Sequence, residues 1–379
     1  MPFWPLTVLS ALLHAYIGWR LLPHLGAASA GWALGGVLIC SAMLMPMGLL
    51  ARRISHRAAS EALAWAGLIF MGLFSSLFVL TLMRDVVLLL GAAVTAIAGG
   101  SLAEVTLWTA RAVPLLAGGV TLWGFINARR RAAIVLVEVP IRGLPPALQG
   151  FTIAQISDIH VGPTIKGPYV QAIVDAVNGM QADMVAVTGD LVDGSVRELS
   201  AHVAPLAGLS SRHGTFFVTG NHEYYSGAHA WIAELRRLGV TVLMNEHAVL
   251  QHGSAPLVVA GVADFSAHLF DPTHRSDPQA AVAGAPAHAA VRVLLAHQPR
   301  SAEAAERAGF QLQLSGHTHG GQFFPWNLFV PLQQPFTAGL HRLKSLWVYT
   351  SRGTGYWGPP KRFGAPSEIT RLTLVAAPA

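Results

Sequence analysis

Long stretches without a charged residue fill the first third of this chain and limit what it can fold into. No Asp, Glu, Lys or Arg occurs in residues 1–19, 31–51 or 62–83, and a fourth apolar stretch follows. Each approaches or exceeds the ~18–20 apolar residues that cross a bilayer. One such run could be a buried core helix or a signal peptide, but a series of them predicts membrane-spanning helices. Within a transmembrane region of residues 1–131 we expect four spans, at residues 4–22, 30–51, 62–83 and 107–127.

The segment 86–103 leaves a second topology open. It is apolar and uncharged, so it either crosses the membrane as a fifth span or lies at the interface as a re-entrant segment. The pair Gly99-Gly100 and the acidic Glu104 favour the second interpretation. An additional crossing would place the rest of the chain on the opposite side of the membrane.

The positive charge of the chain is confined to its apolar part. The formal charge is +6, and through Arg131 nine Arg stand against three acidic residues, whereas the remainder holds sixteen basic and sixteen acidic residues. This distribution is typical of a topology signal, so no nucleic-acid partner is expected. Two basic clusters flank the second and fourth spans: Arg52, Arg53 and Arg57, and Arg129, Arg130 and Arg131.

The positive-inside rule places both clusters in the cytoplasm. We therefore expect a multi-pass protein of the inner (cytoplasmic) membrane, with both termini and the C-terminal domain on the cytoplasmic side. Cys40 is the single cysteine of the chain, so no intramolecular disulfide can form. This agrees with a cytoplasmic domain.

Five short polar clusters follow one another in the second half of the chain, each after an apolar run typical of a β-strand. The predicted strands are residues 153–156, 184–187, 216–218, 291–295 and 311–314. The clusters that follow them are Asp158-Ile159-His160, Gly189-Asp190, Gly220-Asn221-His222-Glu223, His297 and Gly316-His317-Thr318-His319. Ligands of α/β sheets bind beyond the carboxyl ends of the strands. The oxygen and imidazole donors are sufficient for two metal ions that share one carboxylate.

In type and order these clusters resemble the pattern DxH, GD, GNH(D/E), H and GHxH of the calcineurin-like metallophosphoesterase superfamily. The continuation Gly320-Gly321-Gln322 is similar to the membrane-associated branch, which joins a transmembrane region to this catalytic domain. The resemblance implies an α/β fold for residues 151–379, in which two mixed β-sheets are sandwiched by helices. Residues 132–150 would form a linker and a first strand.

The resemblance also implies roles for individual residues. Asp190 would bridge two divalent metal ions, Mn²⁺ first, with Fe, Zn²⁺ or Mg²⁺ as alternatives. His222 would act on the substrate as the catalytic residue, and Glu223 would orient it by a hydrogen bond. The remaining metal ligands would be Asp158, His160 and His319 for one ion, and Asn221, His297 and His317 for the other.

Other polar residues near these motifs have two interpretations each. Asp193 either supports a ligand from behind or caps a helix. The run from Gly353 to Gly358 matches GxGxxG, but Pro359 and Pro360 follow, so no helix opens there for a pyrophosphate. We expect a tight loop that rims the site rather than a solvent-facing turn. Three basic side chains of this region either meet substrate phosphate or lie in solvent: Arg352, Lys361 and Arg362.

Two classes of function are compatible with these features. A metal-dependent phosphoesterase is favoured over a catalytically inactive membrane scaffold, because no motif position is lost. The expected partners are the lipid bilayer and a phosphorylated, lipid-linked small molecule. Some members of the family it resembles cleave the pyrophosphate of a UDP-linked diacylated glucosamine in lipid A biosynthesis. The alternative is a general phosphodiesterase of nucleotides or other lipids.

Overall fold

The computed structural model describes residues 3–378, which form two compact units that we treat separately. The outer limits of the two predicted domains, Met1 and Ala379, lie outside the described residues. The helical unit contains the chain up to Arg129 together with Gly358–Phe363. The α/β unit contains Arg130–Trp357 and the chain from Gly364 onward. Six residues near the C-terminal end of the chain therefore belong to the helical unit.

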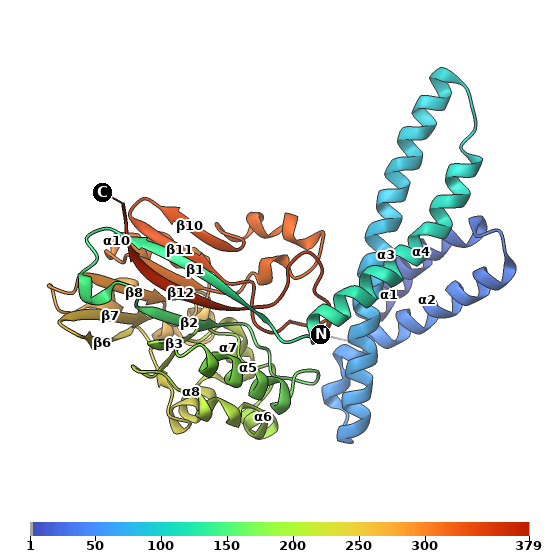
Figure 1. The fold of residues 1–379 in the computed structure, drawn as a ribbon. Coiled ribbons are helices and arrows are strands. Elements are labelled where there is room, and N and C mark those ends of the chain that lie inside the picture. Colours follow the sequence, from blue (N-terminus) through green and yellow to red (C-terminus); the bar gives the residue numbers. More distant parts are fainter. Residues whose placement is uncertain (1–2, 379) are drawn as a thin grey trace. The chain divides into compact units, whose positions relative to one another are not determined.

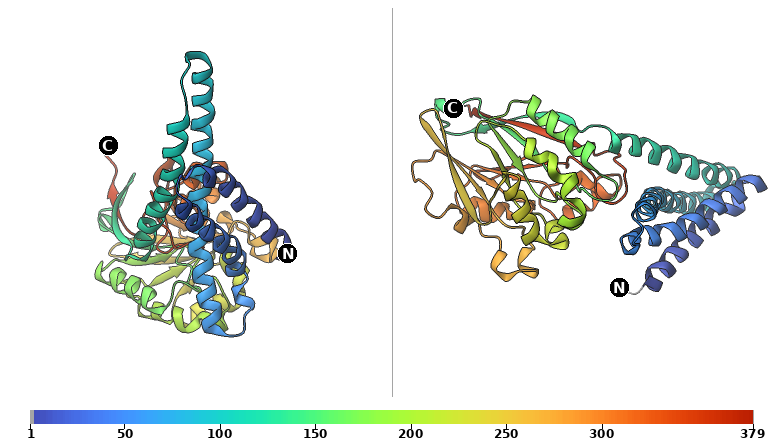
Figure 2. Two further views of the ribbon diagram at one scale, coloured as in Figure 1. Left: turned by 90° about the vertical axis from the view of Figure 1, so that its right-hand side faces the viewer. Right: turned by 90° about the horizontal axis from the view of Figure 1, so that it is seen from below.

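Four helices of the helical unit are long and apolar enough to cross a membrane. They are α1 (Phe3–Leu21), α2 (Ala28–Leu49), α3 (Arg57–Ala98) and α4 (Ala103–Arg129), which Figures 1 and 2 show as long rods. Their shared core contains Ile17, Leu21, Leu38, Leu77 and Ala117. The predicted number of long apolar helices therefore agrees with the structure, whereas the side of the membrane on which each end lies remains a prediction.

The expected boundary between a third span and a re-entrant segment is wrong. Residues 86–98 continue α3, a single helix of 42 residues. At 1.5 Å per residue its length is roughly 63 Å, about twice the ~30 Å hydrocarbon core. The charged pair Arg84-Asp85 does not interrupt it, because Asp85 pairs with Arg20 at 2.8 Å and the buried Arg84 donates to backbone carbonyls.

Two mixed six-stranded sheets form the α/β unit, which confirms the predicted fold class (Figure 1). In sheet order, the first contains β1 (Ala133–Ile141), β12 (Glu368–Ala376), β2 (Thr152–Ile156), β3 (Met184–Val187), β4 (Thr215–Phe217) and β5 (Thr241–Val242). The second contains β10 (Gly339–Leu343), β11 (Leu346–Thr350), β9 (Leu312–Ser315), β8 (Val291–Leu295), β7 (Ala255–Gly261) and β6 (Glu246–His252). The strand expected near the linker, β1, pairs with β12 in parallel over its full length and so belongs to the first sheet.

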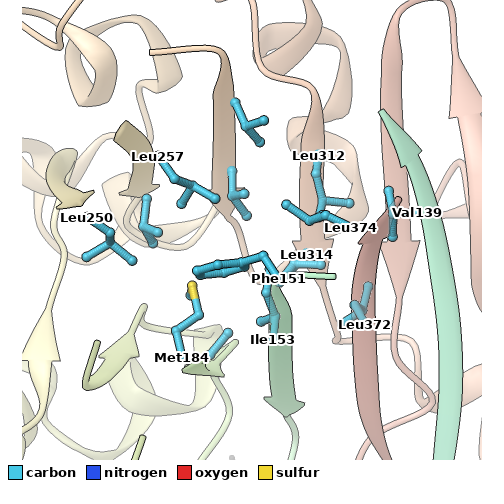
Figure 3. Close-up of a cluster of buried hydrophobic side chains, with 14 of the residues drawn as sticks. Val139, Phe151, Ile153, Met184, Leu250, Leu257, Leu312, Leu314, Leu372 and Leu374 are labelled. Carbon is cyan, nitrogen blue, oxygen red and sulfur yellow. The ribbon is translucent and has the colours of Figure 1, made fainter. Parts of the chain in front are cut away.

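The main hydrophobic core lies between the two sheets. Figure 3 shows Ile153 and Met184 of the first sheet facing the same cluster as Leu257 and Leu312 of the second. All positions of β2, β3 and β9 are buried, as expected for strands that are covered on both faces. The helices are α5 (Gly167–Gly179), α6 (Val196–Val203), α7 (Asn221–Ser226), α8 (Ala228–Arg237), α9 (Pro278–Val282) and α10 (Ala302–Arg307).

Candidate dinuclear metal centre

The five polar clusters lie at the carboxyl ends of five strands and meet at one place. Strands β2, β3 and β4 are parallel neighbours in one sheet, and β8 and β9 are parallel neighbours in the other. The loops are tied across the sheets, because the Nδ1 atom of His297 lies 2.7 Å from the Thr188 carbonyl oxygen. Asp158 also accepts a hydrogen bond from the His317 backbone N–H at 3.0 Å. The structure therefore brings together side chains that are up to 161 residues apart in sequence.

The backbone at these clusters is strained in a consistent way. Five clustered residues have positive φ angles, namely Asp158 (53°), His160 (55°), Asp190 (51°), His317 (71°) and His319 (52°). Only nine non-glycine residues in the described chain have this conformation. Each costs of order 1–3 kcal/mol unless the surrounding structure enforces it, and such residues concentrate at functional sites. The strain turns successive side chains of each loop toward a common point.

Close packing of backbone and carboxylates explains two glycines of the motifs. A Cβ atom on Gly316 would overlap the carboxylate of Asp158, and one on Gly220 would overlap that of Asp190. Neither neighbour can move, because both carboxylates are buried and hydrogen-bonded to backbone N–H groups. We therefore expect any side chain at Gly316 or Gly220 to displace a clustered residue.

The first group of metal-binding type contains Asp158, His160 and His319. The Nε2 atoms of the two histidines are 3.0 Å apart, and the Nε2 atom of His319 lies 3.4 Å from Oδ1 of Asp158. All three side chains are buried. Their nitrogen and oxygen atoms lie close enough together to bind one divalent cation.

The second group contains Asp190, His297 and His317. The Nε2 atom of His297 lies 3.2 Å from both Oδ2 of Asp190 and Nδ1 of His317. Next to this group, the Oδ1 atom of Asn221 is buried and has no hydrogen-bond partner among the described residues. A buried, unpaired amide oxygen is unfavourable unless a ligand satisfies it. The donor set therefore fits a second cation.

Asp190 lies between the two groups. Its Oδ2 atom is 3.2 Å from Nε2 of His297 and 3.9 Å from Nε2 of His160. One carboxylate thus reaches both sets of donors, and the residues present fit two divalent ions that share it.

Of two outer carboxylates, Asp193 lies behind a predicted ligand, which was one of its two expected roles, whereas Glu223 has other partners than expected. Glu223 does not contact His222, because its Oε atoms accept hydrogen bonds from the backbone N–H groups of Asp190, Leu191 and Gly220 at 2.6–3.0 Å. It therefore holds the backbone of two loops that carry predicted metal ligands. Asp193 instead accepts from Nδ1 of His222 at 2.6 Å, and from Nδ1 of His160 at 3.1 Å.

The alternative role of Asp193 as a helix cap is taken by another residue. Helix α6 begins after Ser195, which forms a capping box with Glu198. Asp193 is therefore a support for two histidines, and the expectation that Glu223 orients His222 is wrong. The side chain of Glu223, which is longer than that of Asp, reaches past the adjacent His222 to the backbone N–H groups of Asp190 and Leu191.

Comparison with known proteins agrees with this geometry. Residues 151–321 match the family model described as calcineurin-like phosphoesterase, and this range contains all of the clustered residues. A protein of Aquifex aeolicus, named an uncharacterized metallophosphoesterase, is 32% identical over 224 residues, which cover 59% of this chain and 84% of that protein. The chain belongs to the calcineurin-like metallophosphoesterase family.

Two further relatives of this metallophosphoesterase are similar over a larger share of the chain. One, from Bos taurus, is named a transmembrane protein with metallophosphoesterase domain and is 42% identical over 267 residues, covering 67% of this chain and 60% of the relative. Another, an uncharacterized metallophosphoesterase from Helicobacter pylori, is 39% identical over 257 residues, covering 66% of each chain. The metallophosphoesterase thus spans about three-fifths to two-thirds of the length of these relatives.

Burial and mutual charge shift the pKa values within the metallophosphoesterase site in opposite directions. Burial raises the pKa of Asp158. It also acts to raise that of Asp190, but the neighbouring His297 holds the Asp190 pKa well below its usual range. For His222, burial lowers the pKa, but the hydrogen bond to Asp193 and the charge of Asp190 outweigh it and raise the pKa to about 9. These shifts favour the ionised form of Asp190 and the protonated form of His222.

The loop Gly353–Trp357 lies against the first ligand cluster, as the sequence predicted. The backbone N–H groups of Thr354 and Gly355 donate to the carbonyl oxygens of Ser157 and Asp158 at 2.7 and 3.1 Å. At its end, the ring of Trp357 lies 5.6 Å from that of His222. The GxGxxG match therefore marks a rim of the site and not a nucleotide-binding turn.

Aromatic side chains around the site were missed by the motif-based interpretation. We call Tyr225, Phe270, Trp326, Phe329 and Trp357 the aromatic rim; each exposes between 44% and 61% of its surface. Tyr225 packs on His222 at 5.1 Å and on Phe270 at 5.5 Å. Trp326 begins the 3₁₀ turn η9 (Trp326–Leu328), which packs on the segment η8 (His319–Gly321). Aromatic residues beside the polar motifs were the sequence signal that could have revealed this rim.

The three basic residues that we expected near substrate phosphate have other partners. Arg352 forms an ion pair with the buried Glu368, with Nε 2.6 Å from Oε2. Lys361 and Arg362 are fully buried and belong to the helical unit. The Lys361 Nζ donates to the carbonyl oxygen of Gly72 at 2.8 Å and to Oγ of Ser76 at 2.5 Å. The structure therefore contradicts both the substrate-binding role and the solvated-loop alternative for Lys361 and Arg362.

Proposed function

We propose that the protein is a membrane-anchored, dinuclear-metal-dependent phosphoesterase that hydrolyses a phosphate ester or pyrophosphate bond. The observation that carries this proposal is the position of Asp190 between two groups of donors, with His222 beside it. Asp190, Asp158, His160 and His319 would hold one cation, and Asp190, Asn221, His297 and His317 would hold the other. Bound cations would neutralise the phosphoryl oxygens and lower the pKa of a water that attacks phosphorus.

His222 supplies the proton in the proposed reaction. Its Nδ1–H is donated to Asp193 at 2.6 Å, so the Nε2–H faces the cluster, 3.9 Å from Oδ2 of Asp190. The hydrogen bond to Asp193 and the charge of Asp190 favour the protonated form of the ring by raising its pKa. It can then donate to a phosphoryl oxygen or protonate the leaving group. Glu223 keeps the loops of Asp190 and Asn221 at a fixed separation through three backbone hydrogen bonds.

The aromatic rim favours an amphipathic substrate. Five exposed aromatic side chains beside a charged site suit a molecule that joins a phosphate to an apolar part, because aromatic residues bind at the boundary of polar and apolar phases. The long apolar helices agree with a substrate that resides in a bilayer. A lipid-linked pyrophosphate such as a UDP-diacylglucosamine meets these requirements. A phosphodiesterase of nucleotides or other lipids is the second candidate, and an inactive scaffold the third.

Mn²⁺ is the first candidate for both cations, followed by Fe, Zn²⁺ and Mg²⁺, because mixed oxygen and imidazole donors suit these ions better than Ca²⁺. The test is a screen of the full-length protein in detergent with each cation. Phosphomonoesters, phosphodiesters and nucleotide–lipid pyrophosphates would be offered in parallel. Turnover of a lipid-linked phosphoester above that of a soluble diester is the expected result. Two metals per chain without turnover of any of these would favour the scaffold.

We further propose that the α/β unit lies in the cytoplasm, at the inner membrane. The support is the pair of Arg clusters at residues 52–57 and 129–131. A C-terminal reporter that is active only outside the cytoplasm should stay silent, whereas one that is active only in the cytoplasm should give a signal. The reverse pattern would contradict the proposed orientation.

A further inference from the structure

A second cluster of metal-binding type lies outside the dinuclear site. It contains His229 at the start of α8, Asp271, and His274 at the end of the 3₁₀ turn η6 (Pro272–His274). One ligand atom of each residue lies within 4.8 Å of the other two. None of the five motifs includes these residues, so the family resemblance assigns them no role.

The two oxygens of Asp271 are used differently. Oδ1 accepts hydrogen bonds from the backbone N–H and the hydroxyl of Thr273, at 2.9 and 2.6 Å. This turn fixes the carboxylate and leaves Oδ2 directed at the imidazoles. Oδ2 lies 3.0 Å from Nε2 of His229 and 4.0 Å from Nε2 of His274. Two imidazole nitrogens and one carboxylate oxygen form a donor set of the kind that binds Zn²⁺.

The other ring nitrogen of His274 has a suitable partner. Its Nδ1 atom lies 2.8 Å from the hydroxyl of Tyr224, which also bonds Thr219. When Nδ1 carries the proton and donates it to the Tyr224 oxygen, the lone pair of Nε2 is free and faces Asp271. Such an outer hydrogen bond is the usual companion of a metal-binding histidine.

The distances allow a cation after small movements. Ligand atoms about 2.0 Å from a tetrahedral Zn²⁺ are roughly 3.3 Å apart, compared with 3.0 and 4.0 Å here. The side chain of His229 is 74% exposed and can change rotamer, whereas Asp271 and His274 are only 24% and 17% exposed. Asp271 and His274 are thus held in position before a metal binds, whereas His229 would move in from the solvent-exposed side.

We propose that His229, Asp271 and His274 bind a third divalent transition metal ion, of the Zn²⁺ class, with solvent as the fourth ligand. Its position suggests a consequence for the segment that carries Asp271 and His274. Phe270 of this segment packs on Tyr225, and Tyr225 packs on His222. Occupancy fixes this part of the aromatic rim. That consequence rests on the proposed phosphoesterase function, whereas the metal site itself does not.

Metal stoichiometry tests the site without any substrate. Full-length protein, purified without a polyhistidine tag, would be dialysed against low-micromolar Zn²⁺, and the bound metal would be counted per chain. We expect His274→Ala and Asp271→Asn to bind about one equivalent fewer than the natural sequence while retaining the rest. The matched control is His268→Ala, a partly exposed histidine of the same segment that bonds only to the Phe265 carbonyl among the contacts described.

Equal stoichiometry of the natural protein and His274→Ala would overturn the proposal, as would the same loss in His268→Ala. His229→Ala covers the case in which a more buried substitution disturbs folding, because the exposed ring of His229 contributes little to the core. We expect it to weaken binding of the additional equivalent by about 10- to 100-fold, a loss typical of an impaired metal site. Unchanged affinity in this variant would also overturn the site.

Hydrogen exchange then tests the consequence for the rim. Addition of the third equivalent should slow amide exchange in residues 265–275 of the natural protein and leave it unchanged in His229→Ala. An equal response in both proteins would overturn the link between the metal and the rim. Failure of the phosphoesterase proposal would appear only in turnover, so the two failures are distinguishable.

Discussion

The strand-end cluster and the aromatic rim differ in how the chain holds them. Most of the clustered residues are buried, and five of them lie on positive-φ backbone. They are fixed by hydrogen bonds such as those that Glu223 accepts from three backbone N–H groups. The rim residues are exposed and, apart from Tyr225 of the short helix α7, lie on turns and loops. The difference indicates a division of work. In the proposed function, the cluster would determine whether a phosphoester is hydrolysed at all, and the rim would determine which substrate is presented to it.

The largest effect is expected at the shared carboxylate. Asp190→Asn replaces an anion that reaches both donor groups by a neutral amide. Because such sites supply several kcal/mol of transition-state stabilisation, kcat should fall by about 10³-fold or more on every substrate. Metal content, measured on the same samples, should fall below two per chain. A variant with two metals and near-normal turnover would exclude Asp190 as the bridge.

A smaller loss, again on every substrate, is expected at the proton donor. His222→Ala should lower kcat by about 10²- to 10⁴-fold while metal content stays near that of the natural protein, because His222 bonds to Asp193 and belongs to neither proposed ligand set. Metal analysis beside kinetics separates the two roles. Loss of metal in this variant would move His222 into the ligand set.

Asp193→Asn should act through His222. The carboxylate of Asp193 helps to raise the pKa of His222 to about 9, so its removal lowers that pKa. The acid form of His222 is then lost at a lower pH, and the alkaline limb of the pH dependence of kcat should move to lower pH. The drop in kcat at neutral pH should be about 10- to 100-fold, as for other outer-sphere partners. An alkaline limb that stays in place would show that Asp193 does not control the proton of His222.

The smallest effect, and the only selective one, is expected at the rim. The double variant Trp326→Ser, Phe329→Ser removes two exposed aromatic rings and should lower activity on a vesicle-embedded phosphoester by about 10-fold, comparable to the loss of one buried apolar side chain. Hydrolysis of a soluble aryl phosphodiester should not change. Val249→Ser, which alters an exposed apolar residue on the edge strand β6, is the matched control. Equal loss on both substrates would abolish the proposed division between cluster and rim.

The sequence predicted the strand-end residues because each motif follows a short apolar run, and both signals are local. It could not assign Asp193 and Glu223, because their partners depend on side-chain reach: Glu223 passes its neighbour His222 to reach the backbone of Asp190. It also divided α3 at Arg84-Asp85, since the partner of Asp85 is Arg20, far away in sequence. Neither the contact of Glu223 with Asp190 nor that of Asp85 with Arg20 produces a repeating pattern that can be recognised in the sequence.

The burial of Lys361 could not be predicted for the same reason. A basic residue after two prolines indicates a solvated loop, yet its methylene groups pack where Gly72 and Gly124 leave room. The residues that bury Lys361 are glycines of α3 and α4, whereas Lys361 itself lies in a loop near the end of the chain. No local sequence pattern therefore reveals that it is buried.

The inclusion of Gly358–Phe363 in the helical unit has a consequence for the order of synthesis. Helix α4 ends at Arg129, and the ribosome must add roughly 230 residues before Lys361 is made, which takes on the order of 10 to 50 s at about 5–20 residues per second. Until then the Gly72 carbonyl and the Ser76 hydroxyl lack the ammonium group that they bind in the finished protein. The helices are thus the first part of the chain to be translated, but their contacts with Lys361 are among the last to form. A chaperone or lipid that occupies this gap during translation would be displaced only after every metal-binding motif has left the ribosome.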